Sequence, residues 1–240
     1  MYVKEKAEEI IADAKRHKVI IEPFNFRDDH RKCSVKNGRI VYAIPLIRDC
    51  NMAAAEALYK NKDTKREYFW QLVVDLLNSG LDASKLKILI RLGFFEEFGN
   101  IKKLLRIYDV LEFFKFGERK SIKKSQVVEG DFMYNVISEN STSTNAKGEE
   151  LKTFKDLNIE KILNTYEDNI RNLNLEDMDF KNKIATQKEY LGFVSLITGR
   201  EEDRPKLYVK DVIPLVRKKD KAQFGYSVIA QSIGSGIETR

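Results

Sequence analysis

The spacing of the apolar residues changes along this chain, and that change limits the folds open to it. Between residues 52 and 114 apolar side chains recur every three or four positions, as at Phe69, Leu72 and Leu76. This is the period of an amphipathic helix. Over residues 223–231 the side chains follow the alternating period of a strand instead. Two separate blocks with different periods predict an α+β fold.

The first block divides into four predicted helices with short connections. Asp82 is suited to cap the third helix because its carboxylate can accept backbone N–H groups. Gly93 can adopt the left-handed conformation that ends the same helix. The predicted helices cover residues 52–59, 68–77, 85–92 and 101–114.

A β-hairpin is predicted ahead of these helices. The pair Asn37-Gly38 takes the positive φ angles of a type I′ turn at little cost, and residues 33–36 and 39–42 flank it as strands. A helix over 7–16 and a short strand at 19–21 are expected to precede the hairpin.

The segment after the helical block has a different composition. A basic run from Lys115 to Lys124 leads into Ser138–Asn145, which is too polar to bury a side chain. Such a composition predicts a mobile polar linker, here over 116–155. Helices near 159–173 and 188–197 are expected to follow it.

Charge and composition restrict the class of protein only mildly. The formal net charge of +6 arises from 43 basic and 37 acidic residues, which favours polyanionic partners weakly. Cys33 and Cys50 have neither metal-ligand spacing nor the density of a disulfide scaffold. No apolar run approaches the length of a membrane span, and the N-terminus does not resemble a signal peptide. We therefore expect a soluble cytoplasmic protein without a membrane partner.

Three stretches carry a family resemblance when they are read in order. They are residues 21–25 (IEPFN) before the hairpin, residues 81–105 (LDASKLKILIRLGFFEEFGNIKKLL) and residues 188–193 (KEYLGF). In the same order, they are similar to three motifs of one protein family: a "PPDIN"-like stretch, an "LNRRALEKLIKAGAFDSLGNRAAL" type of segment and an "EKEVLGFY" signature. Together they resemble the region after the fingers of the bacterial C-family replicative DNA polymerases, the DNA polymerase III alpha subunits.

The resemblance implies both a domain plan and a function. It implies a helix-hairpin-helix-type domain with a β-hairpin over 1–115, the linker over 116–155, a helical connector over 156–204 and an incomplete oligonucleotide-binding (OB) barrel over 205–240. The implied function is to position duplex or single-stranded DNA within a DNA-directed DNA polymerase, a nucleotidyltransferase. The catalytic palm with its Mg²⁺ ions lies upstream of everything matched, so no catalytic residue, metal site or cofactor is expected on this chain.

The basic turn between residues 217 and 221 is the main candidate for contact with nucleic acid. Cations beside an OB barrel neutralise phosphates, and aromatic side chains on its strands can stack on bases. The alternative is that these aromatic side chains face the barrel core and the lysines only solvate a hairpin. Cations on the predicted helix 101–114 could follow a duplex backbone, or could be a solvated face. The predicted nucleic-acid-binding residues are Arg217, Lys218, Lys219, Lys221, Phe224, Tyr226, Arg48, Asn51, Lys102, Lys103 and Arg106.

Two acidic stretches of the sequence must be compared with the DNA-binding turn and the metal-binding carboxylates of the polymerase family. Asp49-Cys50-Asn51 occupies the place of the family's G-x-G hairpin turn, and the charge of Asp49 opposes a phosphate there. Asp177 and Asp179 resemble a metal-binding pair, but no predicted strand surrounds them to fix the geometry. We interpret them as a solvated turn that caps the next helix.

Partners other than DNA follow from the resemblance. Gln126 and Asp131-Phe132-Met133 lie where the family often carries a sliding-clamp peptide, so clamp contact through residues 126–134 is a hypothesis. Gly234-Ser235-Gly236 would open a third strand, and two or three strands cannot close a barrel. Either the chain is a fragment of a longer polypeptide, which we favour, or another chain supplies the missing strands. The alternative functions are a non-catalytic replisome scaffold and a free-standing nucleic-acid-binding protein.

Overall fold

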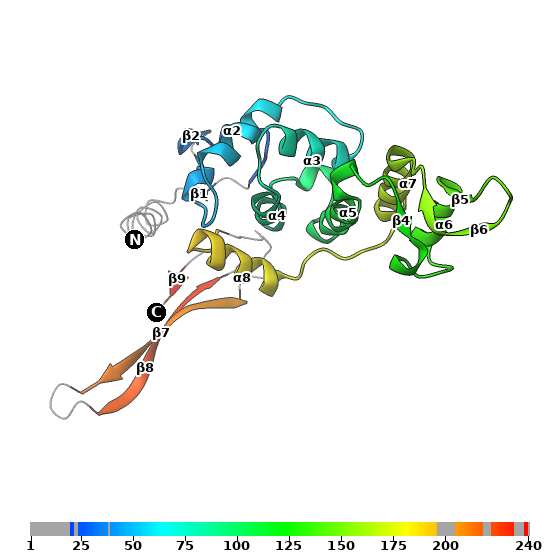
Figure 1. Ribbon diagram of the computed structural model, residues 1–240. Helices are drawn as coiled ribbons and strands as arrows, with labels where there is room; N and C mark the ends of the chain where they lie inside the picture. The colour runs from blue at the N-terminus through cyan, green and yellow to red at the C-terminus, as the bar shows by residue number, and fades with distance from the viewer. Residues whose placement is uncertain are drawn as a thin grey trace. The chain divides into compact units, whose positions relative to one another are not determined.

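The computed structural model of the chain has a mixed α+β fold, as predicted (Figure 1). It describes residues 20–21, 24–37, 39–195, 205–217, 222–232 and 238–239. The chain divides into two compact units, Met1–Gly192 and Phe193–Arg240. Seven α-helices and three small three-stranded sheets lie in the described residues, and no sheet among these strands closes into a barrel.

The four predicted helices of the first unit are confirmed. Asp82 caps the third of them, its carboxylate accepting a 2.9 Å hydrogen bond from the Ser84 amide, and Gly93 follows that helix with a φ of +86°. The helices are α2 (Met52–Asn61), α3 (Phe69–Asn78), α4 (Ala83–Arg91) and α5 (Ile101–Phe113).

The predicted β-hairpin is also present. Strands β2 (Ser34–Lys36) and β3 (Arg39–Val41) pair antiparallel, and Asn37 between them has a φ of +52°. Strand β1 (Ile20–Ile21) pairs parallel with β3, which gives the order β1-β3-β2. The helix predicted over 7–16 lies outside the described residues.

Aromatic side chains form much of the core of the first unit. The rings of Phe24 and Phe94 stack at 4.6 Å, and Phe95 packs 5.5 Å from both Phe26 and Phe69. Phe26, Phe69 and Phe95 are completely buried. The segment ahead of the hairpin is therefore fixed to α3 and to the end of α4 by burial of large apolar surfaces.

Residues 116–155 differ from the predicted polar linker because they are folded. After the short 3-10 helix η3 (Lys115–Gly117), a sheet of order β4-β6-β5 forms with one helix beside it. Phe154 and Ile137 are completely buried, and the Tyr134 ring lies 5.3 Å from Phe154. The elements are β4 (Ile122–Lys123), η4 (Lys124–Gln126), α6 (Phe132–Glu139), β5 (Thr142–Thr144) and β6 (Glu150–Lys155).

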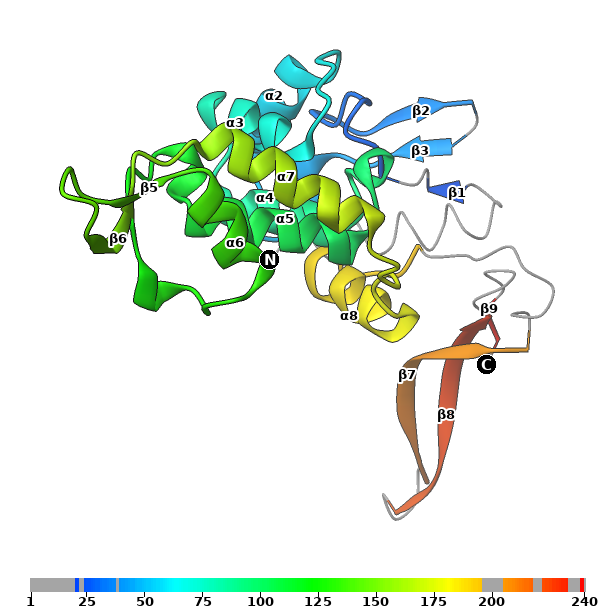
Figure 2. The ribbon, with the colours of Figure 1, turned by 90° about the vertical axis from the view of Figure 1, so that its right-hand side faces the viewer.

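Helices α7 (Ile159–Asn172) and α8 (Phe180–Leu191) complete the first unit. The prediction for α7 is confirmed, whereas α8 begins eight residues before the predicted 188 and ends at Gly192, whose φ is +80°. Helix α7 packs against α3, α5 and α6 (Figure 2). No helix in the described ranges is long and apolar enough to cross a lipid bilayer.

The second unit contains a long β-hairpin. Strands β7 (Leu207–Val216) and β8 (Gln223–Ser232) pair antiparallel, and β8 covers the strand predicted over 223–231. Register shifts between Val209 and Asp211 and between Leu215 and Val216 mark irregularities in the pairing. The short strand β9 (Glu238–Thr239) pairs with β8, so the order is β7-β8-β9.

Candidate nucleic-acid interface

One face of the β7–β8 hairpin carries exposed apolar and aromatic side chains. Alternation along β8 puts Tyr226 and Val228 on the same face, and Phe224 lies at the register shift opposite Leu215 and Val216, where it has no partner on β7. The register places Pro214 opposite Tyr226 and Val212 opposite Val228. Phe224 is 60% exposed and Tyr226 is 62% exposed. A ligand could therefore reach both rings.

The turn at the end of this hairpin is described only at its edges. The Arg217 amide donates a 2.9 Å hydrogen bond to the Ala222 carbonyl, which closes the turn, and the Arg217 side chain is exposed. Lys218, Lys219 and Lys221 lie outside the described residues. These three lysines are therefore known as part of the turn from the sequence alone, and Arg217 is the one turn cation that the structure describes.

The predicted hairpin between two helices at Asp49-Cys50-Asn51 has a different geometry. A single 3-10 turn, η1 (Ile44–Leu46), precedes it in place of an α-helix, and Pro45 in this turn has no amide N–H to continue a helix. Asp49 has a φ of +63°, and Asn51 caps α2 by accepting a 3.1 Å hydrogen bond from the Ala54 amide. The side-chain oxygen of Asn51 is therefore engaged in helix capping.

Arg48, the cation of this turn, is exposed but is not an isolated positive charge. Its Nε lies 3.7 Å from a carboxylate oxygen of Asp49, and the two side chains are about equally accessible to water, at 65% and 66%. The neighbouring carboxylate lowers the attraction of Arg48 for a phosphate.

The three cations predicted on α5 fall into two groups. Lys102 and Arg106 are exposed and lie four positions apart, so they share one side of the helix. Lys103 instead donates a 2.7 Å hydrogen bond from Nζ to the carbonyl of Arg171, at the end of α7. Lys102 and Arg106 remain available to a polyanion, while Lys103 joins two helices.

Of the acidic pair Asp177 and Asp179, only Asp179 caps the next helix as the sequence predicted. Asp179 is the N-cap of α8 and accepts a 2.9 Å hydrogen bond from the Asn182 amide. Asp177 accepts a 3.0 Å hydrogen bond from the Ile101 amide at the start of α5, and it pairs with Lys183. Across the described ranges, no group of three or more His, Cys, Asp or Glu side chains is arranged to hold a metal ion.

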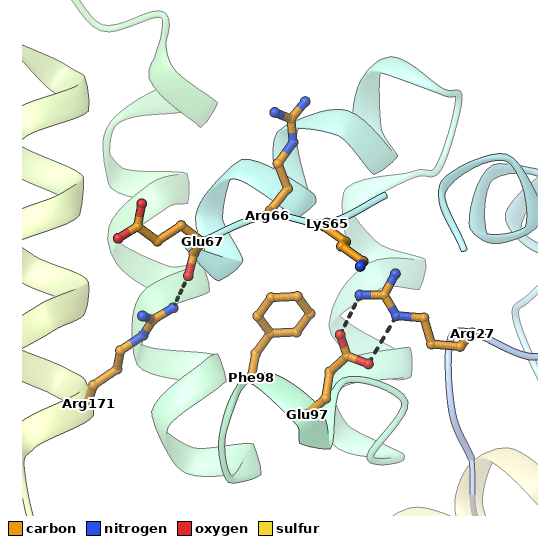
Figure 3. Close-up of a pocket in the computed structure, with 7 residues that line it drawn as sticks. All are labelled: Arg27, Lys65, Arg66, Glu67, Glu97, Phe98 and Arg171. Atoms are coloured by element: carbon orange, nitrogen blue, oxygen red, sulfur yellow. Dashed lines mark hydrogen bonds and ion pairs between the residues drawn. The ribbon is translucent and has the colours of Figure 1, made fainter. Parts of the chain in front are cut away.

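A pocket of about 380 Å³ opens in the first unit at a place that the sequence did not indicate (Figure 3). The half-buried ring of Phe98 lies at its centre, between cationic side chains from distant parts of the chain. The lining residues are Arg27, Lys65, Arg66, Glu67, Glu97, Phe98 and Arg171.

Sequence reasoning missed this pocket because its members are brought together by the fold. Arg27 precedes the hairpin, Lys65 lies between α2 and α3, and Arg171 is on the last turn of α7. The longest continuous part of the lining is Lys65-Arg66-Glu67, and it has the composition of an ordinary solvated loop.

No protein-family model matches this chain, and no curated protein is significantly similar to it. The family resemblance of the motifs at residues 21–25, 81–105 and 188–193 therefore stays a prediction.

Proposed function

We propose that this chain is the non-catalytic, DNA-positioning part of a replicative DNA polymerase alpha subunit. Its principal contact with DNA is the β7–β8 hairpin, which binds single-stranded DNA. The observation that carries the proposal is the exposure of Phe224 and Tyr226 in the first part of β8, next to a turn rich in cations.

Both rings are exposed enough to stack on unpaired bases, Phe224 at the register shift of β8 and Tyr226 two residues further along the strand. Base–aromatic stacking contributes about 1–3 kcal/mol per base and tolerates any sequence.

The turn adds an electrostatic contribution. Arg217, Lys218, Lys219 and Lys221 supply four positive charges against the single negative charge of Asp220. Each cation that contacts a phosphate releases condensed counterions, so affinity falls with rising salt. With three or four contacts, the slope of log affinity against log salt is about −2 to −3 for a single strand.

Charge reversal in the turn tests this proposal. The triple variant Lys218→Glu, Lys219→Glu, Lys221→Glu should lose most of its affinity for a thymidine 20-mer, and its salt slope should approach zero. The matched control reverses three lysines of the first unit, Lys147→Glu, Lys152→Glu and Lys155→Glu, and so gives the same net charge. Fluorescence anisotropy between 50 and 200 mM salt measures both quantities. Equal affinity losses in the two triple variants would contradict a specific role for the turn.

Contact with duplex DNA through α5 forms part of the same proposal. Lys102 and Arg106 present two charges on the exposed side of α5, which is a small footprint for a duplex backbone. The double variant Lys102→Glu, Arg106→Glu should weaken binding to a 20-base-pair duplex and leave single-strand binding unchanged. If the double variant lost affinity for single-stranded DNA instead, Lys102 and Arg106 would contact the single strand and not the duplex.

Contact with a sliding clamp through residues 126–134 is proposed from two exposed apolar side chains. Val128 is 69% exposed and Phe132, at the start of α6, is 41% exposed. Side chains of this kind can enter an apolar pocket on a partner. The double variant Val128→Ser, Phe132→Ser should abolish capture by an immobilised bacterial clamp, whereas wild-type chain that is not captured would dispose of the contact.

A further inference from the structure

We propose that the pocket around Phe98 binds a nucleotide, with the base over the Phe98 ring and the phosphate at Lys65. The pocket lies within the Met1–Gly192 unit and shares no residue with the β7–β8 hairpin. The inference is therefore independent of single-strand binding by that hairpin. At about 380 Å³ the pocket falls within the range of small-ligand sites, about 300–1,000 Å³.

Two cations of the pocket have hydrogen-bonding capacity that the described residues do not use. The ammonium of Lys65 points into the pocket and forms no hydrogen bond or ion pair with the described residues (Figure 3). Arg171 uses only one nitrogen, Nη2, which donates to the Glu67 carbonyl at 2.5 Å and to Glu167 at 2.7 Å. Its Nε and Nη1 groups keep three N–H donors for a ligand.

The remaining charged side chains of the pocket are already paired or turned away from Phe98. Arg27 holds Glu97 in a bidentate ion pair, with nitrogen–oxygen distances of 3.1 and 2.5 Å. Arg66 is directed away from the ring and pairs with Asp75 at 2.7 Å, and the Glu67 carboxylate also points away (Figure 3). Of the four cations that line the pocket, Lys65 is the one without a carboxylate partner among the described residues, and its charge would attract an anion.

Arg27 also fixes the position of Lys65. Its Nη1 donates hydrogen bonds to the backbone carbonyls of Lys62 and Thr64, at 2.6 and 2.8 Å. These bonds hold the loop immediately before Lys65 against the segment that precedes the hairpin. The lysine is thus carried on backbone that is attached at two points, which lowers the entropy lost when it binds a phosphate.

The ring of Phe98 is suited to support a flat ligand. It packs 5.6 Å from Phe69 and 6.1 Å from Phe26, so its buried side is fixed by two core rings. Its other side lines the pocket between Arg171 and Lys65 (Figure 3). A base stacked there would have a cation on each side, one for the phosphate and one for oxygen acceptors at the other end of the ligand. A nucleotide has this combination of a planar ring and a phosphate.

Titration with adenosine monophosphate (AMP) tests the site in the full chain carrying Phe224→Ala and Tyr226→Ala, so that a failure of the hairpin does not affect the result. Lys65→Ala should weaken AMP binding about tenfold, as expected for one hydrogen bond from a charged group. The control Lys152→Ala removes an exposed lysine of β6 and should change the affinity less than twofold. Isothermal calorimetry gives the affinities. Absence of AMP binding, or equal losses in the two variants, would overturn the proposal.

Two further arms examine the base and the source of the nucleotide. Phe98→Leu keeps an apolar side chain against Phe69 and should weaken AMP while leaving inorganic phosphate unchanged; equal affinity of this variant for AMP would refute stacking. If a thymidine 8-mer competes with AMP, the nucleotide belongs to a strand, and if it does not compete, the ligand is a free nucleotide. Both results support the site, since both require AMP to bind at Lys65.

Discussion

Glu167 connects two helices through a carboxylate that is completely buried. It accepts a 2.7 Å hydrogen bond from the Phe69 amide and a 3.1 Å hydrogen bond from the Trp70 amide, so a residue of α7 caps the start of α3. Arg171, one turn later on α7, pairs with the same carboxylate at 2.7 Å. Tyr68, the residue at the N-cap position of α3, makes no capping hydrogen bond through its own side chain. The start of α3 therefore depends on Glu167.

Replacing Glu167 by alanine should destabilise the chain by about 3 kcal/mol. Two buried amides lose their acceptor at about 1–3 kcal/mol each, and water entering the space left by the side chain keeps the total near the lower end. Glu167→Gln retains one oxygen acceptor and should cost less, about 1–2 kcal/mol. Urea unfolding followed by circular dichroism measures both values.

The neighbouring Asp168 provides the control for this experiment. It is exposed and accepts only a 3.2 Å hydrogen bond from the Tyr68 hydroxyl, so Asp168→Ala should cost less than about 1 kcal/mol. If Glu167→Ala and Asp168→Ala had the same unfolding midpoint, the reasoning that a buried carboxylate caps α3 would be refuted.

Two further predictions concern ionisable groups. Burial raises the pKa of Glu167 above its ordinary value of 4.5, so the folded chain binds this proton more tightly than the unfolded chain. Its contribution to stability is therefore largest below pH 4.5 and declines as the pH rises through the folded-state pKa, and the stability of wild type relative to Glu167→Gln should fall over that range in urea titrations. Burial also raises the pKa of the Cys50 thiol to about 11. In a Cys33→Ser variant, a disulfide reagent at pH 8 should react with Cys50 far more slowly in the folded chain than in the unfolded chain, and equal rates would contradict its burial.

Local signals predicted most of the regular elements of this fold. The helices α2 to α5 and α7 have apolar stripes wide enough to identify, and Asn37, Asp82 and Gly93 mark turns and caps by their own conformational preferences. The β7–β8 hairpin follows from its alternation in the same way. Each of these features is determined by residues close together in sequence.

The folded segment over 116–155 shows where local reasoning fails. Strands β4 and β6 bury one side chain each, Ile122 and Phe154, and β5 buries none, so the remaining strand residues are free to be polar and the average composition resembles a linker. Burial of Ile137 from α6 completes this small core. The average composition of the segment is polar, but its folded state is stabilised by burial of these few apolar side chains, which an average does not reveal.

The pocket could not be predicted because its geometry depends on tertiary contacts. Arg27, Glu97 and Arg171 become neighbours only after the aromatic core and the Glu167 cap have fixed α3 and α7. No spacing in the sequence relates these residues. Conversely, the Asp49–Asn51 turn looked like a phosphate site by its position, but the fold uses Asn51 as a helix cap.

The affinity of a Phe224→Ala, Tyr226→Ala double variant for a thymidine 20-mer tests the central claim most directly. Loss of two stacking rings, at about 1–3 kcal/mol each, should weaken binding about 30-fold or more at fixed salt. Phe132→Ala, which removes an exposed aromatic ring from α6, should change the affinity less than twofold. Single-strand affinity of the double variant within threefold of wild type would contradict the proposal that the β7–β8 hairpin binds single-stranded DNA.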